Sequence, residues 1–370
     1  MMSKSTNSIL LVTLVAVLAL AAGIIMRGGD KPSEAPSLEK IVVLPTSKPL
    51  IDFNFTDHLG QPFNSNHLEN HWSIVFFGFT HCPDICPTTM HTLKQVKGQL
   101  RSDKKWGNHQ VIMVTVDPKR DSLEKLNAYV PFFDPEFIGL RGDLKTTTEF
   151  AKQLGILFVS RPADDEGRYD VDHSAALILI NPQGEMAGVI PAPHDADEIA
   201  RDLARLADFH SADHIRSDIS GEPASTTTPH VDRKLADRTA NKSIAPITLR
   251  VENAWIRPAP PAAESMAAYM ELFNEGDTPI SITSVESSLF DMTMLHDSLV
   301  ENGVSRMQHR DELVIPANGY YALSPGATHL MLVGTEALPN VGDFVDITIV
   351  TSGAQKLSLN VEVRDPPKLN

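Results

Sequence analysis

"SIVFFGFTHCPDICPTTM", residues 73–90, joins a buried strand, a loop with two cysteines and the start of a helix. The run SIVFFGF is apolar without interruption, which is typical of a strand buried in a parallel sheet. Pro87 suits the first turn of a helix, and apolar residues follow it at helical spacing as far as Leu100. The segment therefore predicts a strand–loop–helix unit of an α/β fold, with both thiols in the loop.

Residues 40–209 continue this alternation of strands and helices. QVIMVTV (110–116) is a second apolar run of strand length, and TEFAKQLGI (148–156) has the pattern of a helix. AALILINPQGEMAGVI (175–190) is expected to form a hairpin, and an amphipathic helix with acidic residues in its first turn closes the region at 195–209. This order predicts an α/β domain.

The composition, 42% apolar and 21% charged residues, is that of a soluble globular protein. A length of 370 residues suggests two domains with ordinary hydrophobic cores. The formal net charge of −15 argues against a nucleic-acid partner and against attachment to an anionic membrane through a basic face.

The N-terminus carries a segment long and apolar enough to span a membrane. ILLVTLVAVLALAAGIIM (9–26) is uncharged and exceeds the usual apolar run of a cleaved signal, although Ala19 and Ala21 keep cleavage as the alternative. We therefore expect residues 1–28 to form an N-terminal transmembrane helix. It would anchor the chain in the bacterial inner membrane by a single pass, with both domains in the periplasm.

The second half of the chain has a different pattern. Residues 210–245 lose all periodicity and are rich in Ser, Thr, Asp and Pro, which predicts a flexible linker. From residue 246 to residue 366, short alternating runs such as ISITSVE (280–286) recur between turn signals such as Asn302-Gly303. No helical pattern of ordinary length occurs there, so an all-β sandwich is expected.

Cys82 and Cys86 are the only cysteines in the chain. A disulfide between them would close a very short loop and add little stability, so a structural bridge is the weaker explanation. A helix N-terminus stabilises thiolates, which act as nucleophiles and as ligands for soft metals. The spacing leaves both roles open, because three intervening residues permit a disulfide and also let two sulfurs flank one ion.

A metal site built on two sulfurs needs a further ligand. His173 comes just before the first strand of the predicted hairpin, and strand ends that meet at one edge of a sheet would bring it to the cysteine loop. His81 competes by proximity in sequence, but it and its neighbour Cys82 would then have to point the same way.

Three stretches here resemble the signature motifs of the Sco/SenC family of thioredoxin-like copper chaperones: FFGFTHCPDICPTTM (76–90), VTVDPKRDS (114–122) and YDVDHSA (169–175). The resemblance extends over about residues 51–207. It implies that Cys82, Cys86 and His173 hold copper, as Cu(I) or Cu(II), with Asp117 in a supporting position. It also implies a role in building the copper A centre of cytochrome c oxidase, by delivering copper or by reducing the receiving cysteines.

The second domain carries histidine and methionine in patterns that strands would place on one face. His296 and Met307 flank the turn at Asn302-Gly303, and either register of that hairpin leaves them within side-chain reach. His329 and Met331 alternate along a later strand and share a face as well. Methionines on one face are normally core residues, but thioether paired twice with imidazole favours Cu(I), which is soft and polarisable.

The spacing H-x10-M-x21-H-x-M of these four residues is similar to the signature of the PCuAC family of periplasmic copper chaperones, over about residues 249–364. The resemblance implies a cupredoxin-like sandwich that binds one Cu(I) through His296, Met307, His329 and Met331. Three further residues lie outside the signature and are interpreted as packing or rim residues: Met292, Met294 and His309.

Together, the two resemblances predict an α/β thioredoxin-like domain at residues 40–209 and an all-β cupredoxin-like sandwich at residues 246–366. The predicted function is a membrane-anchored copper metallochaperone whose partners are the oxidase subunit carrying copper A and other copper chaperones. Copper would pass between the two sites, or both sites would feed the same client. The alternatives are a thiol–disulfide reductase that uses Cys82 and Cys86, with copper incidental, and a periplasmic copper buffer.

Overall fold

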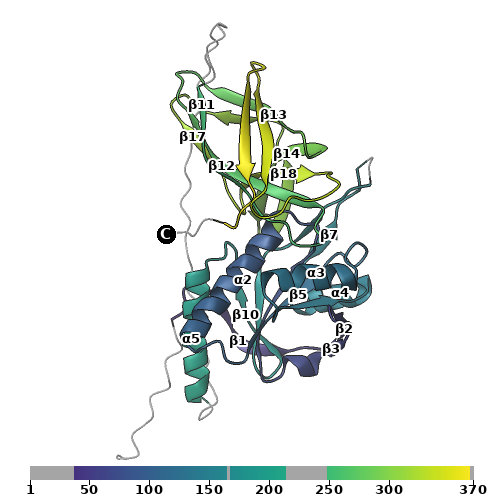
Figure 1. Ribbon diagram of the computed structural model, residues 1–370. Helices are drawn as coiled ribbons and strands as arrows, with labels where there is room; N and C mark the ends of the chain where they lie inside the picture. Colours follow the sequence, from purple (N-terminus) through teal and green to yellow (C-terminus); the bar gives the residue numbers. More distant parts are fainter. Residues whose placement is uncertain (1–36, 165–166, 214–247, 367–370) are drawn as a thin grey trace, which may run out of the picture. The chain divides into compact units, whose positions relative to one another are not determined.

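The computed structural model describes residues 37–164, 167–213 and 248–366 (Figure 1). The predicted membrane anchor at residues 9–26 lies outside the described residues. Among the residues that are described, no helix is both long and apolar enough to cross a membrane. By contacts, Leu38–Ala204 and the C-terminal strands belong to one compact unit, and the end of the last helix from Arg205 belongs to a second.

The N-terminal module, residues 38–204, is built on an eight-stranded sheet in the order β1-β10-β9-β4-β5-β6-β2-β3. Every residue of the central strand β4 is buried, as its apolar run predicts. β4, β5 and β6 are parallel, whereas β9 runs antiparallel to β4. The strands are β1 (Val42–Pro49), β2 (Asn54–Asp57), β3 (Pro62–Asn64), β4 (Trp72–Gly78), β5 (His109–Thr115), β6 (Ile138–Arg141), β9 (Leu177–Ile180) and β10 (Glu185–Ile190).

One 3-10 turn and three helices lie within this module, and a fourth helix, α5, begins in it and runs beyond Ala204: η1 (Ser65–Leu68), α2 (Ile85–Ser102), α3 (Leu123–Phe133), α4 (Leu144–Gln153) and α5 (Ala196–Asp213). α2 begins at Ile85, so that Cys86 lies in its first turn, and it buries the apolar stripe predicted for it. α5 continues to Asp213, past the end predicted at residue 209, because backbone hydrogen bonds rather than apolar spacing set a helix end. The α/β class predicted for this region is confirmed.

α3 is a helix that the sequence pattern did not predict. Ser122 caps it by accepting a hydrogen bond from the backbone N–H of Lys125 at 3.2 Å. Leu126, Val130 and Phe133 on one side of it are buried. Pro131 lies inside the helix, where proline usually interrupts the hydrogen-bond pattern. That proline hid the helix from a reading of the sequence.

The C-terminal module, residues 248–366, is all-β, as predicted, and consists of two packed sheets. One contains β11 (Leu249–Ile256), β12 (Ser265–Asn274), β18 (Thr328–Val333), β14 (Met292–Glu301), β15 (Val304–His309) and, beside β12, β17 (Tyr320–Leu323). The other contains β16 (Leu313–Ile315), β13 (Ile280–Ser287), β19 (Phe344–Thr351) and β20 (Lys356–Glu362). Leucine, isoleucine, valine and methionine side chains from both sheets form its core.

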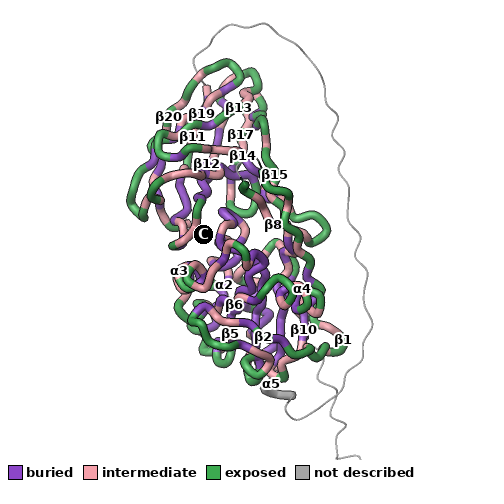
Figure 2. Tube along the Cα trace, turned by 90° about the vertical axis from the view of Figure 1, so that its right-hand side faces the viewer, coloured by how far each residue is buried: buried purple, intermediate pink, exposed green. Residues whose placement is uncertain are grey.

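The first of these sheets continues into the N-terminal module. β15 pairs antiparallel with β8 (Val171–Ser174), which pairs in turn with β7 (Phe158–Ser160). In this register Ser305 faces His173. Figure 2 shows β8 beside β15 in the Cα trace. A shared sheet of this kind cannot be read from either half of the sequence alone.

Candidate metal centres

Cys82 lies in the loop between β4 and α2, whereas Cys86 lies in the first turn of α2 and not in the loop as predicted, because the helix already begins at Ile85. Both thiols are free. They are nearly inaccessible, with exposed fractions of 7% and 1%. A hydrogen bond from the Cys86 thiol lowers the pKa of Cys82, whereas burial raises the pKa of Cys86 well above its ordinary value. Cys82 is therefore the thiol that ionises first.

His173 joins this pair from β8. Its Nε2 atom lies 3.8 Å from the Cys86 Sγ atom, and its Nδ1 atom lies 3.0 Å from the carbonyl oxygen of Ser174. Nδ1 therefore carries the proton and donates to that carbonyl, which leaves the Nε2 lone pair facing the thiols. Burial lowers the pKa of His173, so the ring stays neutral and able to bind a metal.

The spacing between these atoms fits an ion placed between them. Taking the bond lengths of zinc sites, about 2.0 Å to imidazole nitrogen and about 2.3 Å to thiolate sulfur, one shared ion separates the two ligand atoms by about 3.5–4 Å. The observed separation of Cys86 Sγ and His173 Nε2 is 3.8 Å. The chemistry of the donor set, two sulfurs and one imidazole, suits a soft ion such as copper.

The strand order explains how His173 reaches the cysteine loop. The sequence interpretation relied on strand ends that meet at one edge of a parallel sheet. β9 instead runs antiparallel to β4, pairing Ser73 with Ile180 and Val75 with Ile178. The beginning of β9, which follows His173, therefore lies at the carboxyl end of β4, where the cysteine loop begins.

His81, the competing ligand, is turned toward other partners. Its Nε2 atom lies 3.0 Å from Glu264, and its Nδ1 atom lies 3.2 Å from the Thr80 hydroxyl and 3.5 Å from Asp121. With both nitrogens occupied by these polar groups, His81 positions the loop rather than completing the sulfur site.

Asp117, expected to support the metal site, is buried and forms an ion pair with Arg120. Its carboxylate also accepts a hydrogen bond from the Tyr169 hydroxyl at 2.9 Å. The Arg120 guanidinium lies 5.8 Å from the centre of the Phe79 ring, and that ring meets the His173 ring edge-on at 6.1 Å. Asp117 therefore acts on His173 only through these intermediate side chains.

The four histidine and methionine candidates lie on one face of the β14, β15 and β18 strands. His296 pairs with His329 on β18 and with His309 on β15, which is the register of a two-residue turn. Met307 faces Ser298, two residue pairs further along the hairpin, and Met331 faces Met294. This face points away from the sandwich core, and Leu295 and Leu330, on the opposite side of the same strands, pack into that core.

Two imidazole nitrogens on this face are buried and have no hydrogen-bond partner. They are Nδ1 of His296 and Nε2 of His329, whose ring centres are 6.1 Å apart. Burial, together with the nearby rings of His329 and His309, lowers the pKa of His296 to about 4, so it is neutral at physiological pH. Buried nitrogens without partners are costly, and a metal ion would satisfy both.

The residues outside the histidine–methionine signature differ in their surroundings. Met294 faces Met331 and shares its face, so it is a further thioether beside the cluster. The sulfur of Met292 lies 2.8 Å from a guanidinium nitrogen of Arg168. The half-exposed ring of His309 meets that of His296 edge-on at 5.5 Å.

Neither cluster is arranged as a complete metal site. Among residues 37–164, 167–213 and 248–366, no group of three or more His, Cys, Asp or Glu side chains has the arrangement of a bound metal. In the thiol cluster one pair of donor atoms, Cys86 Sγ and His173 Nε2, has the separation that a shared ion requires, and the second cluster draws half of its ligands from methionine. Binding copper would thus require small side-chain movements.

The sequence analysis missed Asp84, which lies between the two cysteines and is fully buried, at 0% exposure. Its partners come from the C-terminal module. The Tyr269 hydroxyl donates to its carboxylate at 2.8 Å and the Ser298 hydroxyl at 2.6 Å. The Gly326 N–H donates at 3.0 Å, and Arg257 forms an ion pair at 3.6 Å. The cysteine loop is therefore docked on the histidine–methionine face through a buried carboxylate.

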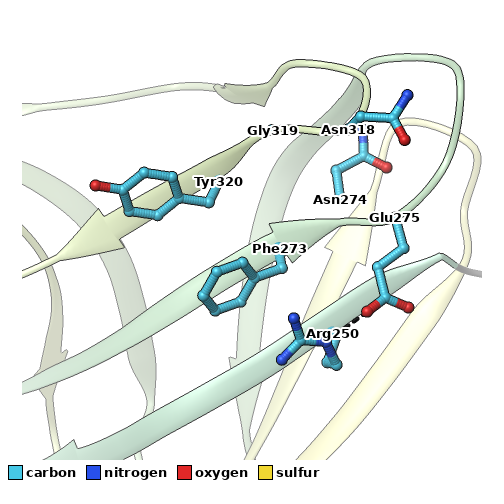
Figure 3. Close-up of a pocket in the computed structure, with 7 residues that line it drawn as sticks. All are labelled: Arg250, Phe273, Asn274, Glu275, Asn318, Gly319 and Tyr320. Carbon is cyan, nitrogen blue, oxygen red and sulfur yellow. Dashed lines mark hydrogen bonds and ion pairs between the residues drawn. The ribbon is translucent and has the colours of Figure 1, made fainter.

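A separate pocket, of about 390 Å³, lies among strand ends of the C-terminal module (Figure 3). The Arg250 guanidinium stacks on the Phe273 ring at 4.4 Å and pairs with Glu275 at 2.5 Å. The Phe273 ring also stacks with that of Tyr320 at 5.8 Å. None of the residues that line this pocket is a cysteine, histidine or methionine, so it offers no soft-metal ligand.

The fold and the site define a thioredoxin-like domain with a buried dithiol–histidine cluster, joined to an all-β domain. Family models match both parts: SCO1/SenC over residues 45–208 and LpqE-like over residues 249–363. The chain is 37% identical over 169 residues to the "Putative copper-binding protein" of Stutzerimonas stutzeri, covering 45% of this chain and 81% of that protein. The chain belongs to the SCO1/SenC family, with an LpqE-like, PCuAC-related domain fused after it.

Three further relatives each match less than half of this chain. The mitochondrial SCO2 homolog of Mus musculus is 35% identical over 161 residues, which are 43% of this chain and 63% of that protein, less than two thirds of its length. Copper-bound ScoI of Bradyrhizobium japonicum has 30% identity, with 42% of this chain and 98% of that chain covered at a TM-score of 0.38. The copper-bound PCuAC domain from PmoF2 has 22% identity, with coverage of 32% and 94% at a TM-score of 0.28.

Proposed function

We propose that this protein is a copper metallochaperone with two copper-binding sites, which supplies copper for the copper A centre of cytochrome c oxidase. The observation that carries the proposal is the pair of buried soft-ligand clusters with unused donor atoms. His173 Nε2 faces two reduced thiols, and His296 and His329 each keep a buried nitrogen without a partner. The name of the relative from Stutzerimonas stutzeri, "Putative copper-binding protein", supports the choice of metal.

Each cluster would hold the ion that suits its ligands. Thioether and neutral imidazole favour Cu(I), so the site formed by His296, Met307, His329 and Met331 would carry the reduced ion. Cys82, Cys86 and His173 would accept Cu(I) or Cu(II), with the thiols losing their protons as the metal binds. Copper is cargo in both sites and would leave by exchange of ligands.

The proposed location is the bacterial periplasm. The apolar segment at residues 9–26 would anchor the chain in the inner membrane by one pass, and both modules would face the periplasm. The partners there would be the oxidase subunit that carries the copper A site and other copper chaperones. Cell fractionation of the full chain tests this placement, and recovery in the cytoplasm would contradict it.

Copper stoichiometry of the purified full chain tests the two-site proposal. The wild type should bind two Cu(I) ions, one per cluster, against a competing chelator. A Cys82→Ser and Cys86→Ser double variant should bind one, and a His296→Ala and His329→Ala double variant should also bind one. His67→Ala, on an exposed histidine remote from both clusters, is the matched control and should still bind two. Two ions in either double variant would reject the assignment.

A thiol–disulfide reductase is the second candidate, favoured by the opposite pKa shifts of the two thiols. A low-pKa cysteine beside a high-pKa partner is the arrangement of a nucleophile and a resolving thiol. His173→Ala separates the two functions. It should abolish copper binding at the thiol site and oxidase assembly together if the chaperone proposal holds. Intact assembly in this variant would favour the reductase.

A copper buffer would need both sites but no client. Full copper binding combined with normal oxidase activity in cells that lack the protein would favour this alternative. Loss of oxidase activity in those cells, restored by the wild type and not by the Cys82→Ser and Cys86→Ser double variant, would support delivery.

A further inference from the structure

The two clusters lie on the same face of one continuous sheet. β8 pairs with β15 so that His173 faces Ser305, and Met307 is two residues further along β15. Residues two apart on a strand point to the same side, so Met307 and His173 share a face. As diagonal neighbours on adjacent strands, their Cα atoms are about 7–8 Å apart, within reach of a methionine side chain.

A small cavity brings these two residues to a thiol. Cys82, His173 and Met307 all line it, together with Ser298 and Ser305. Its volume is about 20 Å³, and about 10–15 Å³ suffices for one water molecule. The cavity therefore has room for a single ion between a thiol, an imidazole and a thioether.

The histidine–methionine cluster borders a second, wider space. Met294, His296 and Met331 line a cleft of about 350 Å³. Its walls include the side chains of Glu264 and Arg168, which are 62% and 41% exposed, so the cleft meets solvent. Copper entering from solvent would meet His296 and Met331 at this cleft before it met the thiols, neither of which lines it.

Asp84 holds the loop in this position. Its carboxylate accepts hydrogen bonds from Tyr269, Ser298 and Gly326. Ser298 also lines the small cavity and faces Met307 across the strands. The contacts that dock the loop thus also fix one wall of the space between Cys82 and Met307.

We propose that Cys82, His173 and Met307 form a transient Cu(I) site through which copper passes between the two clusters without entering solvent; this rests on the proposed function. Copper stays in the +1 state throughout. The Met307 sulfur keeps its bond to copper while the Met331 sulfur and the nitrogens of His296 and His329 release it. Cys82 Sγ and His173 Nε2 take their places, and the Cys82 proton passes to water. Cys86 Sγ then replaces the Met307 sulfur, and the Cys86 proton also passes to water. The same exchanges in reverse, with both thiolates taking up protons, return the ion.

A crosslinking experiment on the full chain tests the geometry without copper. Met307→Cys is combined with Cys86→Ser, so that Cys82 is the one native thiol left, and the protein is treated with the short thiol crosslinker dibromobimane. Gln308→Cys in the same background is the matched control, because the next residue on β15 points to the opposite face. We expect an intramolecular crosslink with Met307→Cys and little with Gln308→Cys. Equal yields, or none with Met307→Cys, would overturn the proposed site.

A kinetic experiment tests the path. One equivalent of Cu(I) is mixed with the full chain, and the ultraviolet absorption of Cu(I)–thiolate bonds is followed by stopped flow. Met307→Leu should slow the appearance of that absorption by at least about tenfold, equivalent to about 1.4 kcal/mol, without lowering its final amplitude. Met294→Leu, which removes a thioether from the same face, should leave the rate within about twofold.

The outcomes separate this inference from the proposed function. A wild-type rate in Met307→Leu, or equal slowing in Met294→Leu, would overturn the transfer path and leave the two copper sites standing. Absence of any Cu(I)–thiolate absorption in the wild type would overturn the proposed function and the path together.

Discussion

Replacing Tyr269 with phenylalanine should expose the two thiols without unfolding the protein. The Tyr269 hydroxyl donates to the Asp84 carboxylate at 2.8 Å, and both residues are buried. The ring, which packs against Trp255 at 4.7 Å, is unchanged by the substitution. The variant therefore removes one hydrogen bond from the docked loop and little else.

The expected rise in the population of the undocked loop follows from the charge of the Asp84 carboxylate, which accepts the hydrogen bond. A hydrogen bond to a charged group contributes about 1.5–3 kcal/mol when its loss leaves the group buried. In the undocked loop, water solvates Asp84, so the substitution raises the free energy of the docked state alone. At about 1.4 kcal/mol per factor of ten, the undocked population should rise by about tenfold to about 150-fold.

The assay is the rate at which iodoacetamide alkylates Cys82 in the full chain. When redocking is fast relative to alkylation, this rate is proportional to the undocked population. Tyr321→Phe is the matched control, because it removes a hydroxyl that lies 2.8 Å from the Thr328 hydroxyl within the same module. We expect a change of less than about twofold in that control. Wild-type alkylation in Tyr269→Phe, or equal acceleration in both variants, would refute the docking role of Asp84.

Three further predictions concern the framework around the sites. In Gly78→Ala, the added Cβ would lie 3.0 Å from Cys86 Sγ. The Cu(I) affinity of the thiol site should therefore fall in a chelator competition, and the free energy of unfolding should fall by about 1–3 kcal/mol. Asp121→Asn should lower the unfolding free energy by about 3 kcal/mol in urea, since this buried carboxylate accepts hydrogen bonds from the Thr80 and Thr115 hydroxyls, both at 2.6 Å. Burial lowers the pKa of His194 to about 4 in the folded protein, whereas its ordinary value of 6.5 applies to the unfolded chain. The free energy of unfolding should therefore decrease by about 1–3 kcal/mol as the pH falls from about 6.5 to about 4.

A specific outcome would contradict each of these three predictions. An unchanged Cu(I) affinity in Gly78→Ala would mean that Phe76, whose ring lies 2.7 Å from the added carbon, takes up the whole strain. Equal urea midpoints for Asp121→Asn and the wild type would contradict the role of the buried carboxylate. For His194, the sign follows because the unfolded chain binds the extra proton in this pH range. His194→Asn should flatten the slope, and an unaltered slope would assign it to other groups.

The fold was predictable wherever apolar patterns were long and uninterrupted. β4, β5, α2 and the β9–β10 hairpin lie within a few residues of their predicted positions, because burial on both faces leaves a clear signature in sequence. α3 was missed because of its internal proline. The pairing of β15 with β8 was missed because a strand of four residues carries too few side chains to show a pattern, and because its partner lies in the other module.

The site residues could be proposed from residue type and spacing, but their surroundings could not. The turn signal at Asn302-Gly303 left two registers open for His296, and the structure has that of the two-residue turn, in which His296 faces His309. Asp84 gave no such signal. Its importance arises from Tyr269 and Arg257, which are far away in sequence and reach the loop only because the two modules pack together.

Docking of the loop and loading of the histidine–methionine cluster are compatible, because they use different atoms of the same imidazole. His329 Nδ1 lies 3.5 Å from the Asp84 carboxylate and 3.1 Å from the Ala327 carbonyl, so that nitrogen serves the docked interface. Nε2 is the buried nitrogen without a partner, and it stays available to copper. A copper ion bound there would therefore leave Asp84 in place. The loop would then stay docked beside a loaded cluster, as transfer by ligand exchange requires.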